Sequence, residues 1–77
     1  MSSRILYVED EPFLAKIVKE TFEHQGFEVL HLSEGTEVLQ ELEKFDPEIC
    51  ILDVMLPKID GYALGKLIRK QRPELPI

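Results

Sequence analysis

Two short apolar runs that each end in carboxylates constrain the fold more than any other feature of this sequence. Residues 5–8 (Ile-Leu-Tyr-Val) are followed directly by Glu9 and Asp10. Residues 49–52 (Ile-Cys-Ile-Leu) are followed in the same way by Asp53. Continuous runs of strand-forming apolar residues are typical of strands buried on both faces of a parallel sheet. We therefore expect two parallel strands that carry acidic side chains at their carboxyl ends.

Helical patterns fill the segments between the expected strands. Pro12 suits the first turn of a helix, where its missing N–H costs nothing, and Gly26 is a natural C-terminal stop. A second helix ends before Pro47, because the residue preceding a proline is pushed out of the helical region, and residues 62–71 form a third. The expected apolar faces comprise Phe13, Leu14, Ile17, Val18, Thr21 and Phe22, then Val38, Leu39, Leu42 and Phe45, then Leu64, Leu67 and Ile68.

The alternation of strands and helices predicts the fold class. Residues 27–32 read as a less buried strand at a sheet edge, and residues 75–77 as the first part of a further strand. Strands that alternate with helices at this spacing favour a doubly wound α/β fold, in which right-handed crossovers place helices on both faces of a parallel sheet. We expect three strand–helix units and the start of a fourth strand.

Composition excludes several classes of function. The 15 acidic residues outnumber the 9 Lys and Arg, which leaves a net charge of -6 and no basic field for direct binding of nucleic acid. No window resembles a membrane span or a signal peptide. The single cysteine, Cys50, excludes a disulfide framework and suits the cytoplasm, and its place in an apolar strand indicates packing rather than redox chemistry.

The acidic residues at the two strand ends form the candidate site. Ligands of open parallel sheets bind beyond the carboxyl ends of the strands, where Glu9, Asp10 and Asp53 would meet. Two carboxylates about 4 Å apart repel by roughly 4 kcal/mol at an effective dielectric near 20, so three need a counter-charge. Mg2+ prefers such oxygen ligands, and its charge would let Asp53 act as a nucleophile toward a phosphoryl group.

The motifs around these carboxylates resemble those of one protein family. Residues 5–12, 51–57 and 60–62 are together similar to the receiver domain of bacterial two-component response regulators, which has a flavodoxin-like fold. The resemblance implies that Asp53 is the phosphoacceptor and that a histidine kinase or phosphotransfer protein is the donor. It also implies that Mg2+ is held by Glu9, Asp10, Asp53 and the backbone carbonyl of Met55. The family more often has aspartate in place of Glu9, so direct and water-mediated contact with the metal both stay open.

The resemblance also sets what the chain is expected to do in a phosphorelay. It covers residues 1–77, whereas a complete receiver has about five strand–helix units. We expect an incomplete domain without the Ser or Thr after strand four and the Lys after strand five, and therefore without switching by the family's usual route. A receiver accepts a phosphoryl group and acts as a switch, so we do not expect an enzyme.

Three alternatives were weighed against this interpretation. A phosphatase of the haloacid dehalogenase type needs a second aspartate where Met55 stands, and a flavodoxin-like cofactor protein would not place Glu9 and Asp10 against a phosphate. A folding or oligomerisation module is the alternative of a different class, because an open sheet edge invites pairing with a second copy. Tyr7 and Phe45 are expected in the core, and neither His24 nor His31 is expected to bind a ligand.

Overall fold

The computed structural model of the chain describes residues 3–53, 56 and 59–77. Within these residues, one parallel sheet has the strand order β2-β1-β3, with β1 at Arg4–Val8, β2 at Glu28–Leu32 and β3 at Ile49–Leu52. The expected parallel pairing and the edge position of the second strand are confirmed. The central strand is β1, in which Val8 pairs with Leu32 on one side and with Leu52 on the other.

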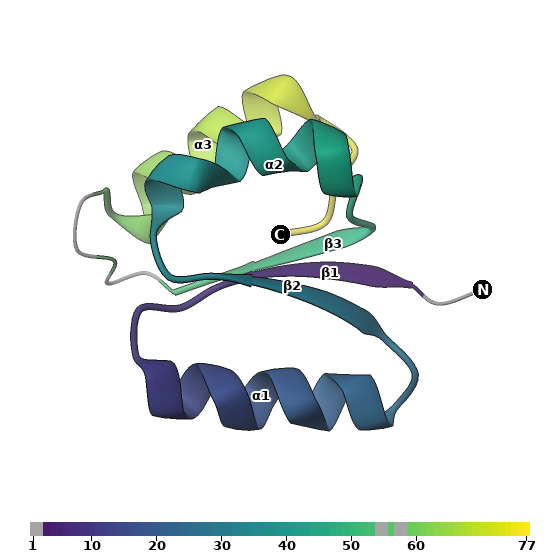
Figure 1. The fold of residues 1–77 in the computed structure, drawn as a ribbon. Coiled ribbons are helices and arrows are strands. Elements are labelled where there is room, and N and C mark those ends of the chain that lie inside the picture. The colour runs from purple at the N-terminus through teal and green to yellow at the C-terminus, as the bar shows by residue number, and fades with distance from the viewer. Residues whose placement is uncertain (1–2, 54–55, 57–58) are drawn as a thin grey trace.

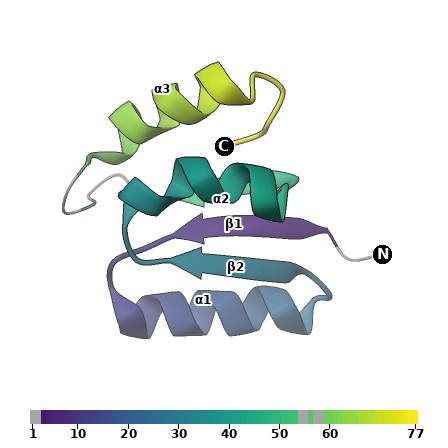
Figure 2. The same ribbon diagram turned by 45° about the horizontal axis from the view of Figure 1, so that its top comes forward.

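Helices cover both faces of the sheet, as a doubly wound fold requires. Helix α1 (Pro12–His24) lies on one face, and α2 (Val38–Phe45) and α3 (Gly61–Gln71) lie on the other (Figure 1). The view in Figure 2 separates α3 from α2 and shows α1 on the opposite side of β1 and β2. No described helix combines the length and the apolar composition that crossing a membrane requires.

Local sequence signals mark the helix ends. The Glu11 side chain accepts a hydrogen bond from the Phe13 N–H (3.0 Å) at the start of α1, where Pro12 is the first residue. Gly26 follows α1 with φ of 95°, a conformation that suits glycine. The Asp60 side chain accepts from the Ala63 N–H (2.8 Å) and caps α3. The predicted start of α1 at Pro12 and its stop before Gly26 are therefore confirmed, and α3 begins at Gly61, one residue before the predicted start.

The start and end of α2 differ in kind from those of the other helices. A single 3-10 turn, Gly35–Glu37, leads into α2, and no side chain caps the helix at Glu37. Asp46 ends α2 in the left-handed conformation (φ 49°, ψ 64°), where its carbonyl accepts from the Arg4 guanidinium (2.9 Å). This bond ties the end of α2 to the start of β1.

The main core lies between the sheet and the α2/α3 layer. Leu6 and Val8 of β1 and Cys50 of β3 are fully buried on this side, whereas Leu52 at the end of β3 is partly buried. This cluster comprises Leu6, Val8, Leu32, Val38, Leu42, Cys50, Leu56, Leu64, Ile68 and Leu75. One predicted member of the α3 core face is wrong, because Leu67 is 43% exposed. The other two predicted members, Leu64 and Ile68, are buried.

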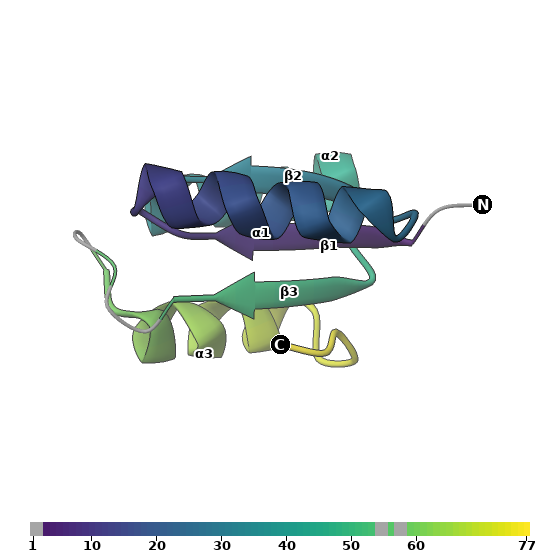
Figure 3. The ribbon, with the colours of Figure 1, turned by 90° about the horizontal axis from the view of Figure 1, so that it is seen from below.

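The core beneath α1 is smaller and leaves apolar side chains open. Its buried members are Ile5, Tyr7, Ala15 and Val29. Four residues of the predicted apolar face of α1 are exposed, namely Phe13 (75%), Leu14 (47%), Ile17 (51%) and Thr21. Figure 3 shows the reason: α1 lies over β1 and β2, and no described helix covers β3 on this side. The prediction that residues 49–52 are buried on both faces is accordingly wrong for Ile49.

The last residues of the chain run along the free edge of β3. The Cys50 N–H donates to the Pro76 carbonyl (2.9 Å), although residues 75–77 form no assigned strand. A groove of about 870 Å3 lies here between β3 and α3, and Ile77 contributes to its lining. The prediction of a strand that begins at residue 75 is therefore supported by position and by one backbone bond, but not by regular pairing.

Candidate metal centre

Sheet topology brings the predicted acidic residues together. Because β1 and β3 are adjacent and parallel, their carboxyl ends share one edge of the sheet. The Asp53 N–H donates to the Val8 carbonyl (3.0 Å), and the Glu9 N–H donates to the Leu32 carbonyl (3.0 Å). The backbone of both acidic residues is thus still held by the neighbouring strand when the regular pairing ends.

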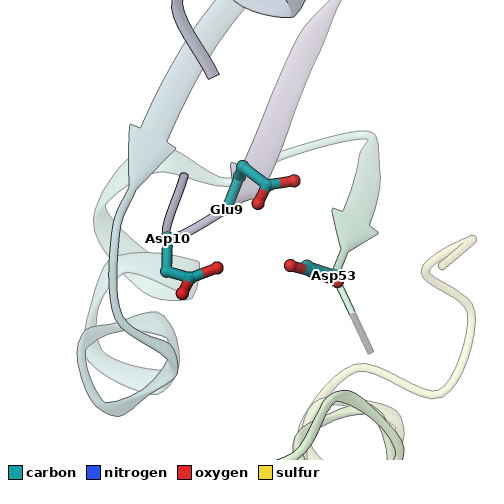
Figure 4. Close-up of side chains that lie close together, drawn as sticks. All are labelled: Glu9, Asp10 and Asp53. Atoms are coloured by element: carbon teal, nitrogen blue, oxygen red, sulfur yellow. The ribbon is translucent and has the colours of Figure 1, made fainter. Parts of the chain in front are cut away.

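The three carboxylates converge on the gap between the ends of β1 and β3 (Figure 4). One oxygen from each of Glu9, Asp10 and Asp53 lies within 4.8 Å of the others. Glu9 is buried (7% exposed), Asp53 is half-buried and Asp10 is exposed. The predicted clustering of these side chains is therefore observed. The fourth predicted metal ligand, Met55, lies outside the described residues.

Both oxygens of the Glu9 carboxylate accept hydrogen bonds from the protein. The Glu11 N–H donates to Oε2 (3.2 Å), and the Tyr7 hydroxyl donates to Oε1 (3.4 Å). The backbone of the same residue is held by β2, because Nε2 of His31 lies 2.8 Å from the Glu9 carbonyl and donates to it when it carries the proton. Glu9 is thus fixed at both its backbone and its side chain.

The environment of Glu9 works against its negative charge. Burial raises the pKa of Glu9 above its usual value, and nearby Asp53 raises it further, while the hydrogen bonds from Glu11 and Tyr7 lower it. Burial, together with the same carboxylate, raises the pKa of Tyr7, so the phenol stays protonated and able to donate. A cation placed among the three oxygens would remove the cost of these charges. The oxygen-only donor set and the number of carboxylates fit a hard divalent ion such as Mg2+.

Sequence reasoning missed the side chains that support Glu9. Tyr7 was assigned to the core, and it is buried there (5% exposed), but its hydroxyl also reaches the acidic centre. His31, which is not expected to bind a ligand, shares the α1 side of the sheet with Val29, and the centroid of its ring lies 5.8 Å from that of Tyr7. The two-residue spacing of Tyr7 and Glu9 was an available signal, since such residues share one face of a strand.

The remaining reactive side chain lies away from the acidic centre. Cys50 belongs to the main core and is fully buried. Burial raises the pKa of its thiol to about 12, which keeps it protonated at neutral pH. The packing role predicted for this residue agrees with its position.

Sequence comparisons find one family over almost the whole chain. The family described as "Response regulator receiver domain" matches residues 5–77. The alkaline phosphatase synthesis transcriptional regulatory protein PhoP of Bacillus subtilis is 38% identical over 77 residues, which is 100% of this chain and 32% of PhoP. The chain spans about a third of the length of the curated relatives that it matches.

Solved structures show the same similarity in three dimensions. A putative response regulator from Chloroflexus aurantiacus superposes with a TM-score of 0.94 at 35% identity, over 100% of this chain and 65% of that one. The response regulator protein TrrA from Thermotoga maritima, solved in complex with Mg2+-BeF, superposes with a TM-score of 0.86 at 32% identity, over 92% of this chain and 62% of that one. Fold and sequence thus agree on one kind of domain.

Proposed function

This chain belongs to the response regulator receiver domain family of two-component signalling, and we propose that Asp53 accepts a phosphoryl group in a Mg2+-dependent reaction. The observation that carries the proposal is the meeting of Glu9, Asp10 and Asp53 oxygens at one sheet edge. The structure of the similar TrrA with Mg2+-BeF supports a Mg2+ site of this kind.

The residues of the acidic centre have different proposed roles in this reaction. An oxygen of Asp53 forms a bond to phosphorus, the bond from phosphorus to the donor breaks, and its electron pair leaves with the donor. When bound, Mg2+ supplies the positive charge that balances the carboxylates and the phosphoryl oxygens. Glu9 and Asp10 provide oxygen ligands for it beside the nucleophile, and the backbone carbonyl of Met55 is proposed as a further ligand. In this role the protein is a phosphoryl acceptor in the cytoplasm, rather than an enzyme.

The donor that we propose is a histidine kinase or a phosphotransfer protein. Phe13 and Leu14 are exposed at the start of α1, directly after the acidic loop, so an apolar surface lies next to the acceptor. A helical donor protein that buried these side chains would bring its phosphohistidine close to Asp53. The net charge of -6 argues against nucleic acid as a direct partner.

Intact-mass measurement with acetyl phosphate tests the acceptor directly. The unmodified chain in Mg2+ should gain the mass of one phosphoryl group, and Asp53→Asn or removal of Mg2+ should abolish the gain. Asp60→Asn is the matched control, because asparagine preserves the N-cap of α3 and the residue lies outside the acidic centre. A gain that survives in Asp53→Asn, or none in a folded, unmodified chain, would contradict the proposal.

A second candidate function is self-association through the outer edge of β3, where the Pro76 carbonyl already accepts a hydrogen bond from the Cys50 N–H. Ile49 is 36% exposed on this strand, and the adjoining groove is lined by apolar residues of β3 and by Ile77, with Lys66 and Arg69 on its α3 side. Exposed strand edges pair readily with another copy. Light scattering after size-exclusion chromatography should show a dimer that Ile49→Lys dissociates and Leu67→Lys, on the exposed side of α3, leaves intact. A monodisperse monomer at micromolar concentration would contradict it.

A further inference from the structure

We propose that Tyr7 is a positioning residue for the metal centre: its buried hydroxyl, together with the Glu11 N–H, holds the Glu9 carboxylate in one orientation toward the cation. The inference rests on the proposed function, because it requires a divalent ion beside Asp53. It adds to that function a residue two positions before the acidic motif, in the core beneath α1.

The Tyr7 side chain is well placed for this role. It is 5% exposed and packs with Ile5, Ala15 and Val29 between the sheet and α1, which restricts its rotamer. Because residues i and i+2 of a strand point to the same side, the ring runs along the strand toward Glu9. The distance from the Tyr7 hydroxyl to Glu9 Oε1 is 3.4 Å. Core packing therefore holds the Tyr7 hydroxyl in place independently of its hydrogen bond to Glu9.

His31 completes the support on the neighbouring strand. Tyr7 pairs with His31 in the sheet register, and their rings are tilted by 43° with centroids 5.8 Å apart. Nε2 of His31 lies 2.8 Å from the Glu9 carbonyl. The buried ring of Tyr7 and the half-buried ring of His31 thus contact Glu9 at its carboxylate and at its carbonyl.

A glutamate at this position needs such support more than an aspartate would. Its additional side-chain torsion costs more conformational entropy to fix. The negative charge of Asp53 also favours orientations that turn the Glu9 carboxylate away from the centre. Hydrogen bonds from the protein to a metal-binding side chain commonly contribute about 10- to 100-fold in metal affinity. The Tyr7 hydroxyl and the Glu11 N–H supply such hydrogen bonds to the Glu9 carboxylate.

The first test is a double-mutant cycle on cation affinity. Free Mn2+ is measured by electron paramagnetic resonance, and Mg2+ affinity by competition, for the unmodified chain, Tyr7→Phe, Glu9→Asp and the double variant. Tyr7→Phe should weaken Mg2+ binding about tenfold. In the Glu9→Asp background it should have no further effect, because the shorter side chain withdraws the carboxylate from the hydroxyl. Tyr62→Phe, at the 75% exposed tyrosine, should leave affinity unchanged.

The outcomes separate this inference from the proposed function. No binding of either cation to the unmodified, folded chain would overturn the metal site and the role of Tyr7 with it. Normal binding that Tyr7→Phe leaves unchanged would overturn the role of Tyr7 alone. If Tyr7→Phe weakened Mg2+ binding equally in the unmodified chain and in the Glu9→Asp variant, its effect would be a general structural one. That result would also overturn the role of Tyr7.

A spectroscopic measurement tests the inference without altering Tyr7. In the Tyr62→Phe chain Tyr7 is the single tyrosine, so the ultraviolet difference spectrum on addition of Mg2+ reports the hydrogen bond of its hydroxyl. A saturable tyrosine difference signal that Glu9→Gln abolishes is the expected result. Bound Mg2+ without any such signal would overturn the inference, even if Tyr7→Phe failed to fold.

Discussion

The two faces of the sheet have different amounts of buried apolar surface and different tasks. Among the described residues, the face covered by α2 and α3 buries ten in one cluster, whereas the face covered by α1 buries four. Figure 3 shows that α1 reaches over β1 and β2 but not over β3. The α1 face in turn carries Tyr7 and His31, which hold Glu9. Stability is therefore concentrated on one face, and the support of the acidic centre on the other.

Thiol labelling of Cys50 measures how completely the α2/α3 face is closed. Since burial raises the pKa of this thiol to about 12, labelling with an aromatic disulfide near pH 8 should be roughly a thousandfold slower in the folded chain than in denaturant. In a Cys50→Ser/Leu67→Cys variant the exposed thiol should react at once. Rapid labelling of Cys50 in native buffer would show that this face opens readily.

Alanine substitutions compare the energetic weight of the two faces. Leu42 is fully buried on the α2/α3 face, so Leu42→Ala should lower the free energy of unfolding by about 2–5 kcal/mol. Ile51 is half-buried on the other face, and Ile51→Ala should cost about 1 kcal/mol. Urea unfolding followed by circular dichroism measures both. Equal losses would remove the proposed difference between the faces.

The pH dependence of stability tests whether the folded state raises the pKa of Glu9. Burial, with Asp53 nearby, raises the pKa of Glu9, so the folded state holds this proton more tightly than the unfolded state. The resulting contribution to stability is fully present below the unfolded pKa and is lost as pH rises through the folded pKa. Glu9→Gln should therefore stabilise the metal-free chain at neutral pH, by less than Leu42→Ala destabilises it. Thermal unfolding from acid to neutral pH measures the difference.

Glu20→Gln on the exposed side of α1 is the control for that experiment. Because this side chain is exposed, the substitution should change the free energy of unfolding at neutral pH by no more than about 0.5 kcal/mol. Adding Mg2+ should then stabilise the unmodified chain more than Glu9→Gln, because a ligand that binds the folded state shifts its stability. A Glu9→Gln chain that is less stable than the parent at neutral pH would contradict the direction predicted here.

The exposed apolar residues of α1 should contribute least to stability. Phe13 is 75% exposed, so Phe13→Ser should change the free energy of unfolding by no more than about 0.5 kcal/mol. Phe22→Ser on the same helix is the matched control and should cost more stability. The Phe22 ring packs edge-on against the Phe27 ring, with the two ring centroids 5.9 Å apart. Chemical denaturation distinguishes the two. A large loss for Phe13→Ser would mean that this side chain is buried in solution.

Much of the acidic centre was predictable because it depends on local order along the chain. An apolar run followed at once by a carboxylate places that carboxylate at a strand end wherever the strand lies. Two such runs in a parallel sheet must then bring Glu9, Asp10 and Asp53 to one edge. The resemblance of residues 5–12 and 51–57 to receiver domains identified the same residues independently.

The sequence by itself determined the order of the elements, the parallel sheet and the meeting of the three carboxylates. Only the tertiary structure decided that Leu64 is buried while Leu67 is exposed, and that Phe13 and Ile17 face solvent. Helical periodicity defines an apolar stripe, but the width of the layer beneath it decides how much of the stripe is covered. The contacts of Tyr7 and His31 with Glu9 likewise required the strand register and the side-chain rotamers, which depend on packing between segments far apart in the chain.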